Sequence, residues 1–407
     1  MKKITLTLAS VLFIALAARI GVFYWHNLRG ISPVLKSPPE DIAKLITEYP
    51  AGKNETSFPL ALPPGFSIEI FAKNLPGVRV MAFDQEGNMW VSRTGEGAIT
   101  FLRVENGSVT HQDDAVTGLR NPHGLAFDPA DSSQQYLYFA EEHQVSRLRL
   151  GADGPDVLEK TAALPSGDGH FTRTIGFGPD NQLYVSIGSS CNVCIEKDQR
   201  RAAIYVMEKD GSDFRQFARG LRNAVFFVWH QETKKMWVTE MGRDLIGDNI
   251  PPDEINIVEE GKNYGWPNCY GKNIHDTDFD HNTYIRNPCM EPFETESFID
   301  LPAHSAPLGL AFVPSDAGWP KDYAGNLLVA YHGSWNRTRP TGYKVVRMKF
   351  DKARAYKNME DFISGWLTAQ NEALGRPVDL VFGPDHALYV SDDKAGVIYR
   401  IAPPQVR

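Results

Sequence analysis

The stretch that decides the fold is Ile175-Gly176-Phe177-Gly178-Pro179-Asp180-Asn181-Gln182-Leu183-Tyr184-Val185. It combines an apolar strand, a turn made of Gly, Pro, Asp and Asn, and a second strand that carries an aromatic residue. The same order of elements begins at five other places, which are Met81, Leu125, Phe226, Leu310 and Leu380. Successive starts are 44, 50, 51, 84 and 70 residues apart. Because a repeat of about 40 to 50 residues with about four strands is typical of a propeller blade, the pattern predicts an all-β fold, a six-bladed β-propeller.

The domain organisation follows from the repeat. We expect residues 60–405 to form one propeller domain, with insertions in the two long intervals. The strand Phe66–Phe71 precedes the first repeat, and we expect it to complete the last blade and close the ring. Residues 26–59 are polar and contain prolines, which indicates a linker with one short helix at Pro39–Thr47. A pair of β-sandwich domains is the alternative, but it does not explain the repeat.

Composition narrows the function classes. The 407 residues include 34 glycines and 27 prolines, which suits a fold with many turns. The formal net charge of -8 argues against a general nucleic-acid binder, because phosphate contacts need a basic surface. The mean hydropathy of -0.32 excludes a polytopic membrane protein.

The N-terminus has the features of an export signal. Two lysines precede an apolar run from Ile4 to Ala17, which ends in a small-residue cleavage pattern. Apolar residues resume after Arg19, and the 22 residues from Ile4 to Trp25 are enough to span a bilayer. We therefore expect residues 1–25 to be either a signal peptide or an N-terminal membrane anchor.

The cysteines agree with export. An even count in an exported chain favours disulfides, and proximity along the chain suggests Cys191–Cys194 and Cys269–Cys289. A zinc site built from these four cysteines is the alternative. Ile195 follows Cys194 where c-type haem attachment would require His, so haem attachment is excluded.

His170 is the first candidate for chemistry. It lies in the glycine-containing loop Gly167–Arg173, directly before a strand that we expect to be innermost in its blade. An imidazole near the channel mouth can act as a general base at neutral pH. The alternative is a turn histidine that bonds to the backbone.

Arginines form the second candidate set. They stand at the entrances of the repeats and after an inner strand of the fifth repeat, and they are Arg79, Arg173, Arg222, Arg337 and Arg376. If they converge on one end of the channel, they would bind a small polyanion in an otherwise acidic protein. Asn223, next to Arg222, adds an amide for a carbonyl edge. The alternatives are a surface turn at Arg222 and local pairing of each arginine with an acid such as Asp379.

The insertion Glu240–Asn256 is rich in carboxylates, amides and glycine. Hard oxygen ligands in a tight loop suit Ca²⁺, although the spacing of an EF-hand is absent. A solvated acidic loop is the alternative.

Together these residues resemble the soluble sugar dehydrogenases that depend on pyrroloquinoline quinone (PQQ). The catalytic stretch of that family is similar to His170-Phe171-Thr172-Arg173, Gly178-Pro179-Asp180 and Leu183-Tyr184-Val185-Ser186-Ile187-Gly188. Further motifs follow in the family's order, namely Gly220-Leu221-Arg222-Asn223, Asp253-Glu254-Ile255-Asn256 and Asn263-Tyr264-Gly265-Trp266-Pro267. The sorbosone, pyranose and aldose sugar dehydrogenase branch looks most similar in Gly242-Arg243-Asp244, the Cys191/Cys194 pair and His332-Gly333-Ser334-Trp335. The resemblance covers about residues 60–405.

The resemblance implies a six-bladed propeller that holds PQQ in its channel with Ca²⁺ beside it. His170 would take the proton of the sugar C1 hydroxyl, PQQ would accept the hydride, and Ca²⁺ would act as a Lewis acid. The residues implied to contact the cofactor are Arg79, Arg173, Arg222, Asn223, Gly242, Arg243, Trp335, Arg337, Arg376 and Asp379. The implied calcium ligands are the carbonyls of Gly242 and Arg243 beside PQQ, and Asp253, Glu254 and Tyr264 at a second, structural site.

The implied function is a periplasmic PQQ- and calcium-dependent oxidoreductase. It would oxidise a sugar or sugar aldehyde, an aldose at C1 or a sorbosone-like compound, and pass electrons to a quinone, a periplasmic carrier or an artificial dye. Its partners would be these small molecules and no nucleic acid, with membrane contact only through an N-terminal anchor. Gly169 and Val378 replace an Asp and an Arg of the glucose-oxidising members, which argues against glucose as the physiological substrate. The alternatives are a calcium-dependent lactone hydrolase on a similar propeller and a non-catalytic propeller that binds carbohydrate or protein.

Overall fold

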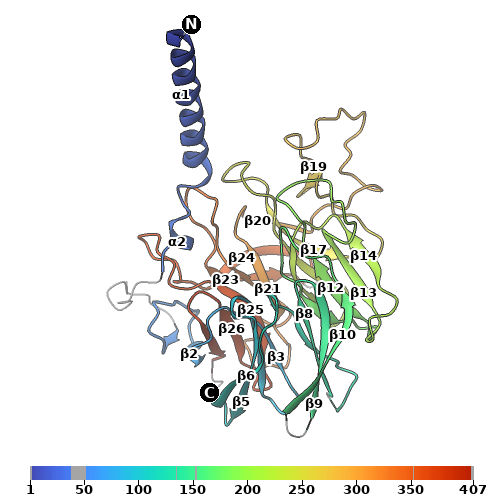
Figure 1. Cartoon of the computed structure of the whole chain (residues 1–407). Coiled ribbons are helices and arrows are strands. Elements are labelled where there is room, and N and C mark those ends of the chain that lie inside the picture. The colour runs from blue at the N-terminus through green and yellow to red at the C-terminus, as the bar shows by residue number, and fades with distance from the viewer. Residues whose placement is uncertain (1, 38–51, 134, 152–153, 352, 405–407) are drawn as a thin grey trace.

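A computed structural model describes residues 2–37, 52–133, 135–151, 154–351 and 353–404. The six repeats form six sheets, and these sheets form a β-propeller (Figure 1). Five of the sheets have four antiparallel strands, and the sixth has a fifth, parallel strand at its edge. The predicted all-β, six-bladed architecture is therefore confirmed. The first strands of the blades lie side by side around the channel: β25 contacts β3, β3 contacts β7, β7 contacts β11, and β15 contacts β21, which contacts β25.

The blades have the following strands. Blades 1 and 2 contain β3 (Val78–Phe83), β4 (Met89–Arg93), β5 (Ala98–Glu105), β6 (Ser108–Val116), β7 (Leu125–Phe127), β8 (Tyr136–Glu141), β9 (Gln144–Gly151) and β10 (Gly154–Ala163). Blades 3 and 4 contain β11 (Ile175–Phe177), β12 (Leu183–Ile187), β13 (Ala203–Met207), β14 (Arg215–Arg219), β15 (Ala224–Trp229), β16 (Met236–Glu240), β17 (Asp253–Val258) and β20 (Ile299–Leu301). Blades 5 and 6 contain β21 (Pro307–Phe312), β22 (Leu327–Tyr331), β23 (Lys344–Phe350), β24 (Tyr356–Ile363), β25 (Pro377–Phe382), β26 (Leu388–Asp392), β27 (Val397–Ala402) and β2 (Ser67–Ala72).

The ring closes through β2. This strand pairs antiparallel with β27, with Ile68 opposite Ile401, so an N-terminal strand completes the last blade as predicted. The short β1 (Lys53–Asn54) pairs parallel with β2 at the edge of the same sheet. Joining the two ends of the chain in one sheet couples the first and last blades, because that sheet cannot form without both.

Bulges in the inner strands are stabilised by hydroxyl groups of the neighbouring strand. In blades 1, 4 and 6 the pairing of the first two strands shifts at the bulge, and a backbone N–H near it donates to a buried hydroxyl. The acceptors in these blades are Ser92 for the N–H of Val80, Thr239 for Phe226 and Ser391 for Asp379. A buried N–H without a partner would be costly, so a Ser or Thr at this position keeps the strand entrance defined. The candidate site residues lie just before or just after the first strands of the blades.

The longest insertion lies in blade 4, between β17 and β20. It contains the small hairpin of β18 (Cys269–Tyr270) and β19 (Ile274–His275), which projects at the top of Figure 1. A disulfide joins Cys269 to Cys289 within it, and a second joins Cys191 to Cys194 after β12. Both predicted pairings are confirmed.

The N-terminal segment carries two helices, α1 (Lys2–Asn27) and α2 (Ser32–Leu35) (Figure 1). Asn27 and Pro33 are buried against the propeller, while α1 projects away from it. The side chains of α1 are described from position 10 onward, and within the described part of the chain no helix has the length and apolarity needed to cross a membrane. The short helix predicted at Pro39–Thr47 lies outside the described residues.

Candidate active site

The loop between β10 and β11 carries His170, and Arg173 holds this loop. The Arg173 side chain is fully buried; its Nη1 donates to the carbonyls of His170 and Thr172, both at 2.8 Å, and its Nη2 donates to that of Pro165 at 2.9 Å. Both terminal nitrogens therefore fix the backbone on either side of His170. The structure gives Arg173 this bracing role, which differs from the cofactor contact that the resemblance implies.

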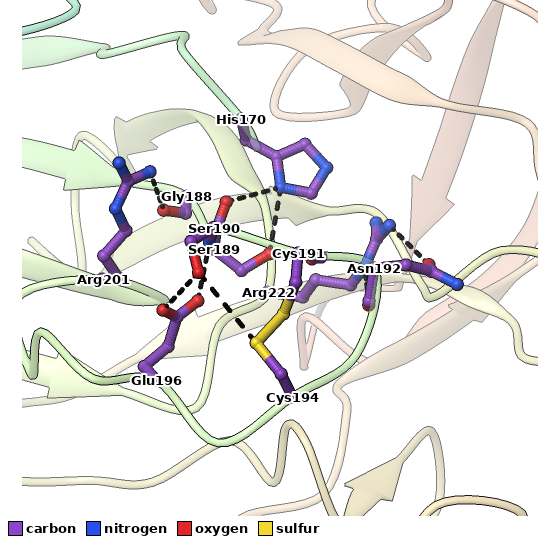
Figure 2. Close-up of a disulfide and its surroundings, with 10 residues drawn as sticks. All are labelled: His170, Gly188, Ser189, Ser190, Cys191, Asn192, Cys194, Glu196, Arg201 and Arg222. Atoms are coloured by element: carbon purple, nitrogen blue, oxygen red, sulfur yellow. Dashed lines mark hydrogen bonds between the residues drawn. A yellow bond between two sulfur atoms is a disulfide. The ribbon is translucent and has the colours of Figure 1, made fainter. Parts of the chain in front are cut away.

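The ring of His170 is oriented by Ser189. Its Nδ1 lies 3.1 Å from the Ser189 carbonyl oxygen and 3.0 Å from Ser189 Oγ (Figure 2). A carbonyl only accepts, so Nδ1 carries the proton, and Nε2, which has no hydrogen-bond partner among the described residues, keeps its lone pair. Burial, together with the charge of Arg222, lowers the pKa of His170 to about 3, so the imidazole is neutral at physiological pH. A neutral imidazole with an unprotonated Nε2 can act as a general base.

Asn223 lies beside His170 because Gly188, the residue between them, has no side chain. A Cβ atom at Gly188 would lie 2.6 Å from the Cβ of His170 and 2.8 Å from Oδ1 of Asn223. Only glycine allows this approach. The Asn223 amide also donates to Met241 Sδ at 3.5 Å, and its backbone N–H donates to Glu240 Oε1 at 3.3 Å. The structure thus brings His170 and Asn223 together as the sequence predicted.

Arg222 is buried, and all five of its guanidinium N–H groups face acceptors of the chain. Nε donates to the Asn192 carbonyl at 2.8 Å, and Nη1 donates to the carbonyls of Gly242 at 2.8 Å and Met241 at 3.3 Å. Nη2 donates to Asn192 Oδ1 and Asp244 Oδ2, both at 2.9 Å. In this arrangement Arg222 places positive charge beside His170, while its N–H groups are engaged within the chain.

A second cationic cluster gathers residues of blades 1, 5 and 6. Arg79 Nη1 donates to Asp393 Oδ2 at 2.7 Å, and His332 Nε2 lies 2.9 Å from Asp393 Oδ1. Arg376 donates through Nε to the carbonyl of His332 at 3.0 Å and through Nη2 to that of Gly333 at 2.6 Å. Among the described residues, Nη2 of Arg79 and Nη1 of Arg376 have no hydrogen-bond partner, so both arginines keep donors for an anionic ligand.

His123 lies between the two groups and was missed by the sequence reasoning. Its side chain is fully buried, Nδ1 lies 3.3 Å from Thr174 Oγ1, and Nε2 has no partner among the described residues. Burial first, and then the charge of Arg79, lower its pKa well below 6.5. His123 lies just before the second repeat, as the His170 loop lies before the third. This position in the sequence could have identified His123 as a candidate site residue.

Three other predicted cofactor residues are Trp335, Arg337 and Asp379, of which Arg337 and Asp379 bond to other parts of the chain. Trp335 is 36% exposed. Arg337 donates to the Ala303 carbonyl at 3.0 Å and to Asn249 Oδ1 at 2.9 Å, away from the pairs described for Arg79 and Arg376. Asp379 accepts from the N–H groups of Met81 at 2.9 Å and Leu380 at 2.8 Å, so it joins blade 6 to blade 1. Both carboxylate oxygens of Asp379 accept hydrogen bonds from backbone N–H groups, and this side chain therefore links two neighbouring blades.

The predicted calcium ligands divide between two faces of β17. Neighbouring residues on a strand point to opposite sides, so Asp253 and Glu254 cannot bind the same ion with their side chains. Asp253 accepts from the N–H groups of Gly242 at 3.0 Å and Ala306 at 2.9 Å, which ties the Gly242 loop to blade 5. The Tyr264 hydroxyl donates to the Ile257 carbonyl at 2.8 Å. The side chains of Asp253 and Glu254 thus lie on different faces of β17, and the calcium site at Asp253, Glu254 and Tyr264 stays a prediction.

Glu240 and Glu254 instead form a buried carboxylate pair. They are directly opposite each other on β16 and β17, and both line a cavity of about 20 Å³ together with Gly242, Arg243 and Tyr264. Glu240 Oε2 is buried without a partner among the described residues. Burial and the charge of Glu254 raise the pKa of Glu240 well above 4.5, and burial raises that of Glu254 to about 7. Two repelling carboxylates at a cavity of this size fit one hard cation, whose charge would offset the repulsion.

Comparisons with known proteins identify the family of the chain. The family model described as TrAA12-like matches residues 60–403. The chain belongs to this family. It is therefore a member of the soluble PQQ-dependent sugar dehydrogenases, a family of oxidoreductases, as the motifs indicated.

Two curated relatives show the range of similarity within the family. The chain is 32% identical over 369 residues to an uncharacterized protein of Borreliella burgdorferi, covering 88% of this chain and 94% of the relative. It is 21% identical over 409 residues to quinoprotein glucose dehydrogenase B of Acinetobacter calcoaceticus, covering 85% of this chain and 79% of that one.

Two solved structures share the fold. The holo form of the pyranose dehydrogenase PQQ domain from Coprinopsis cinerea aligns with a TM-score of 0.70 at 22% identity, covering 87% of this chain and 99% of that chain. The calcium structure of the Trichoderma reesei AA12 enzyme aligns with a TM-score of 0.72 at 19% identity, covering 86% of this chain and 99% of that chain. At these identities the similarity establishes the propeller.

Proposed function

We propose that this family member is a PQQ- and calcium-dependent dehydrogenase that oxidises an aldose at C1 or a sorbosone-like sugar aldehyde. The observation that carries the proposal is His170, a neutral imidazole whose Nδ1 is oriented by Ser189 and whose Nε2 is free. Nε2 can take the proton of a hydroxyl on the carbon whose C–H bond is oxidised, which is C1 of a cyclic aldose or the hydrated carbonyl carbon of an aldehyde.

The residues present fit PQQ. The cofactor carries three carboxylates and would supply the two-electron acceptor when bound. Arg79 and Arg376 keep free N–H groups in the second cationic cluster, and the Asn223 amide lies beside His170. These groups bind and orient an anionic, planar ligand, while Arg222 and Arg173 hold the walls of the site.

Calcium is the cation proposed for Glu240 and Glu254. Carboxylates and backbone carbonyls are hard ligands of the type that Ca²⁺ prefers. The Gly242 and Arg243 carbonyls remain the proposed ligands beside the cofactor, and the Gly242 carbonyl already accepts from a cationic group, Arg222. A cation between Glu240 and Glu254 would hold β16 and β17 at the base of the Gly242 loop.

We further propose an exported protein that works in the periplasm. The N-terminal lysines and the apolar run, together with two disulfides, support it, because disulfides persist in oxidising compartments. The acceptor proposed for its electrons is a quinone or a periplasmic carrier, with an artificial dye as the laboratory substitute.

Reconstitution tests the proposal. Purified protein is incubated with PQQ and CaCl₂, with each alone, and with neither, and dye reduction is followed with a panel of aldoses and sorbosone. We expect turnover with at least one sugar only when PQQ is present, and more when calcium is added. Hydrolysis of lactones by the same protein without PQQ, with no dye reduction in any arm, would instead favour a lactone hydrolase.

A further inference from the structure

The segment that follows β12, residues 188–196, contacts both His170 and Arg222. The carbonyl of Ser189 accepts from the backbone N–H of His170 at 2.9 Å, and the N–H of Ser189 donates to the carbonyl of Arg222 at 2.7 Å. Two residues that are 52 positions apart in the chain are therefore joined through one residue of this segment. Figure 2 shows the segment lying between His170 and Arg222.

Asn192, at the tip of this segment, makes the contacts that fix Arg222. Its carbonyl oxygen accepts from Arg222 Nε at 2.8 Å, and its Oδ1 accepts from Arg222 Nη2 at 2.9 Å. The two bonds engage one edge of the guanidinium, so they set its plane as well as its position. Any other orientation of Arg222 would break at least one of them.

The same side chain also holds the Gly242 loop. Asn192 Oδ1 accepts from the N–H of Asp244 at 2.7 Å, and Asn192 Nδ2 donates to the Asp244 carbonyl at 3.0 Å. Asp244 Oδ2 in turn accepts from Arg222 at 2.9 Å. One amide therefore connects Arg222 to the segment Gly242–Asp244, in which the carbonyls of Gly242 and Arg243 are proposed to face the cofactor and calcium.

A disulfide encloses Asn192. Cys191 and Cys194 are bonded on either side of it, and Ser189 Oγ donates to the Cys191 carbonyl at 2.7 Å. Glu196 completes the ring of contacts, since its carboxylate accepts from Ser190 N–H at 2.6 Å and from Ser190 Oγ at 2.7 Å (Figure 2). A four-residue loop without such restraints would sample many backbone conformations, and ordering Asn192 would then cost conformational entropy.

We propose that Asn192 is a positioning residue of the cofactor site, and that the Cys191–Cys194 disulfide holds it in place. Through its amide it sets Arg222 and the Gly242–Asp244 segment relative to His170. The inference rests on the proposed function, because it assigns Asn192 to the PQQ site. It does not make Asn192 a catalytic residue, since its contacts are with Arg222 and Asp244.

The test compares Asn192→Ala, Cys191→Ser/Cys194→Ser and the triple variant with the wild type. PQQ affinity is measured by quenching of tryptophan fluorescence at saturating calcium. We expect each of the first two variants to raise the Kd for PQQ about tenfold, because charge-assisted bonds to Arg222 are lost or loosened. The Kd of the triple variant should lie within about threefold of the larger of the two Kd values measured for Asn192→Ala and for Cys191→Ser/Cys194→Ser, because both changes act through the same contact. Asn273→Ala is the matched control and should leave the Kd unchanged, because Asn273 is a half-buried asparagine whose side chain bonds to the exposed Glu296.

Two outcomes would overturn the inference. One is an unchanged Kd for Asn192→Ala. The other is a triple variant whose Kd rises by the full product of the separate effects, because the two sites would then act independently.

Hydrogen exchange of the protein without cofactor separates this inference from the proposed function. In the wild type the Asp244 amide is bonded to Asn192, so its exchange should accelerate in Asn192→Ala and in the cysteine variant but not in Asn273→Ala. If the wild type does not bind PQQ, the proposed function fails while this measurement still tests the positioning role. If the wild type binds PQQ and the Asp244 amide exchanges equally in all variants, the positioning role fails alone.

Discussion

His170 Nδ1 lies 3.1 Å from the carbonyl oxygen of Ser189, and this contact decides which ring nitrogen is the base. The carbonyl accepts a hydrogen bond from Nδ1–H, so Nε2 carries the lone pair, and it has no hydrogen-bond partner among the described residues. Burial of the ring lowers the pKa of His170 most, and the charges of Arg222 and Arg173 lower it further, so the ring is neutral at physiological pH.

Replacing His170 should separate chemistry from binding. In His170→Ala and His170→Gln we expect kcat to fall by about 10²- to 10⁴-fold, the usual contribution of a positioned general base. The Kd for PQQ should change little, because His170 lies beside the cofactor site without supplying charge to it. Parallel measurements of dye-linked turnover and fluorescence quenching check this, and a variant that retains wild-type kcat would refute the assignment.

The pH dependence of turnover should reflect the lowered pKa of His170. An unperturbed histidine becomes protonated as the pH falls through 6.5 and would stop acting as a base there. With the pKa at about 3, Nε2 stays unprotonated, so kcat/KM should hold well below pH 6.5 before an acid limb appears. A profile of kcat/KM from pH 4 to 8 tests this, and loss of activity centred near pH 6.5 would contradict it.

The arginines should differ in their effect on PQQ affinity. Arg376→Ala and Arg79→Ala remove N–H groups that are free for a carboxylate, and we expect the Kd for PQQ to rise about 10- to 100-fold. Arg337→Ala serves as the matched control, because its guanidinium is bonded to Ala303 and Asn249, and its Kd should change less than about threefold. Equal losses for all three arginines would mean that Arg337 also reaches the cofactor.

Glu240 should control the response to calcium. Glu240→Gln has the shape of the protonated acid, so its Tm without calcium should be close to that of the wild type. Saturating calcium should raise the Tm of the wild type by roughly 3–5 °C and should leave Glu240→Gln unchanged. Thermal unfolding in EDTA and in CaCl₂ measures this, with the exposed Glu296→Gln as a control that keeps the shift.

The same pair gives the calcium-free protein a pH-dependent stability with a definite sign. Because the pKa values of Glu240 and Glu254 are raised in the folded state, their contribution is fully present below the unfolded value of about 4.5. The contribution of Glu254 is lost as the pH rises through about 7, and that of Glu240 is lost as the pH rises through its own raised pKa. Calcium should remove most of this loss. A calcium-free wild type whose stability does not fall over that range would argue against the buried pair.

Much of the fold could be predicted because each blade repeats a local pattern. The apolar strand, the turn and the aromatic strand lie close together in the chain, so the six starts and the closing strand β2 were visible. His170 and Asn223 could be proposed as site residues for the same reason, since Asn223 stands directly before β15 and the loop that carries His170 leads into β11.

The partners of the site residues come from other blades and could not be predicted in this way. Asn192 and Asp393 have no pattern of their own, and their roles depend on which side chains the ring brings beside them. Arg173 and Asp379 carry the expected charges, but both side chains are buried and hydrogen-bond to the backbone of the chain. Asp253 and Glu254 are adjacent in sequence, yet the alternation of a strand places them on opposite faces.

The most direct test of the account is the reduction of bound PQQ in a single turnover. Protein loaded with PQQ and calcium is mixed without oxygen with each aldose and with sorbosone, and the absorbance of the bound cofactor is followed. We predict that at least one of these substrates reduces PQQ on the wild type, and that His170→Ala does so about 10²- to 10⁴-fold more slowly. Bound PQQ that stays oxidised with every substrate, or equal rates in the two proteins, would contradict the account.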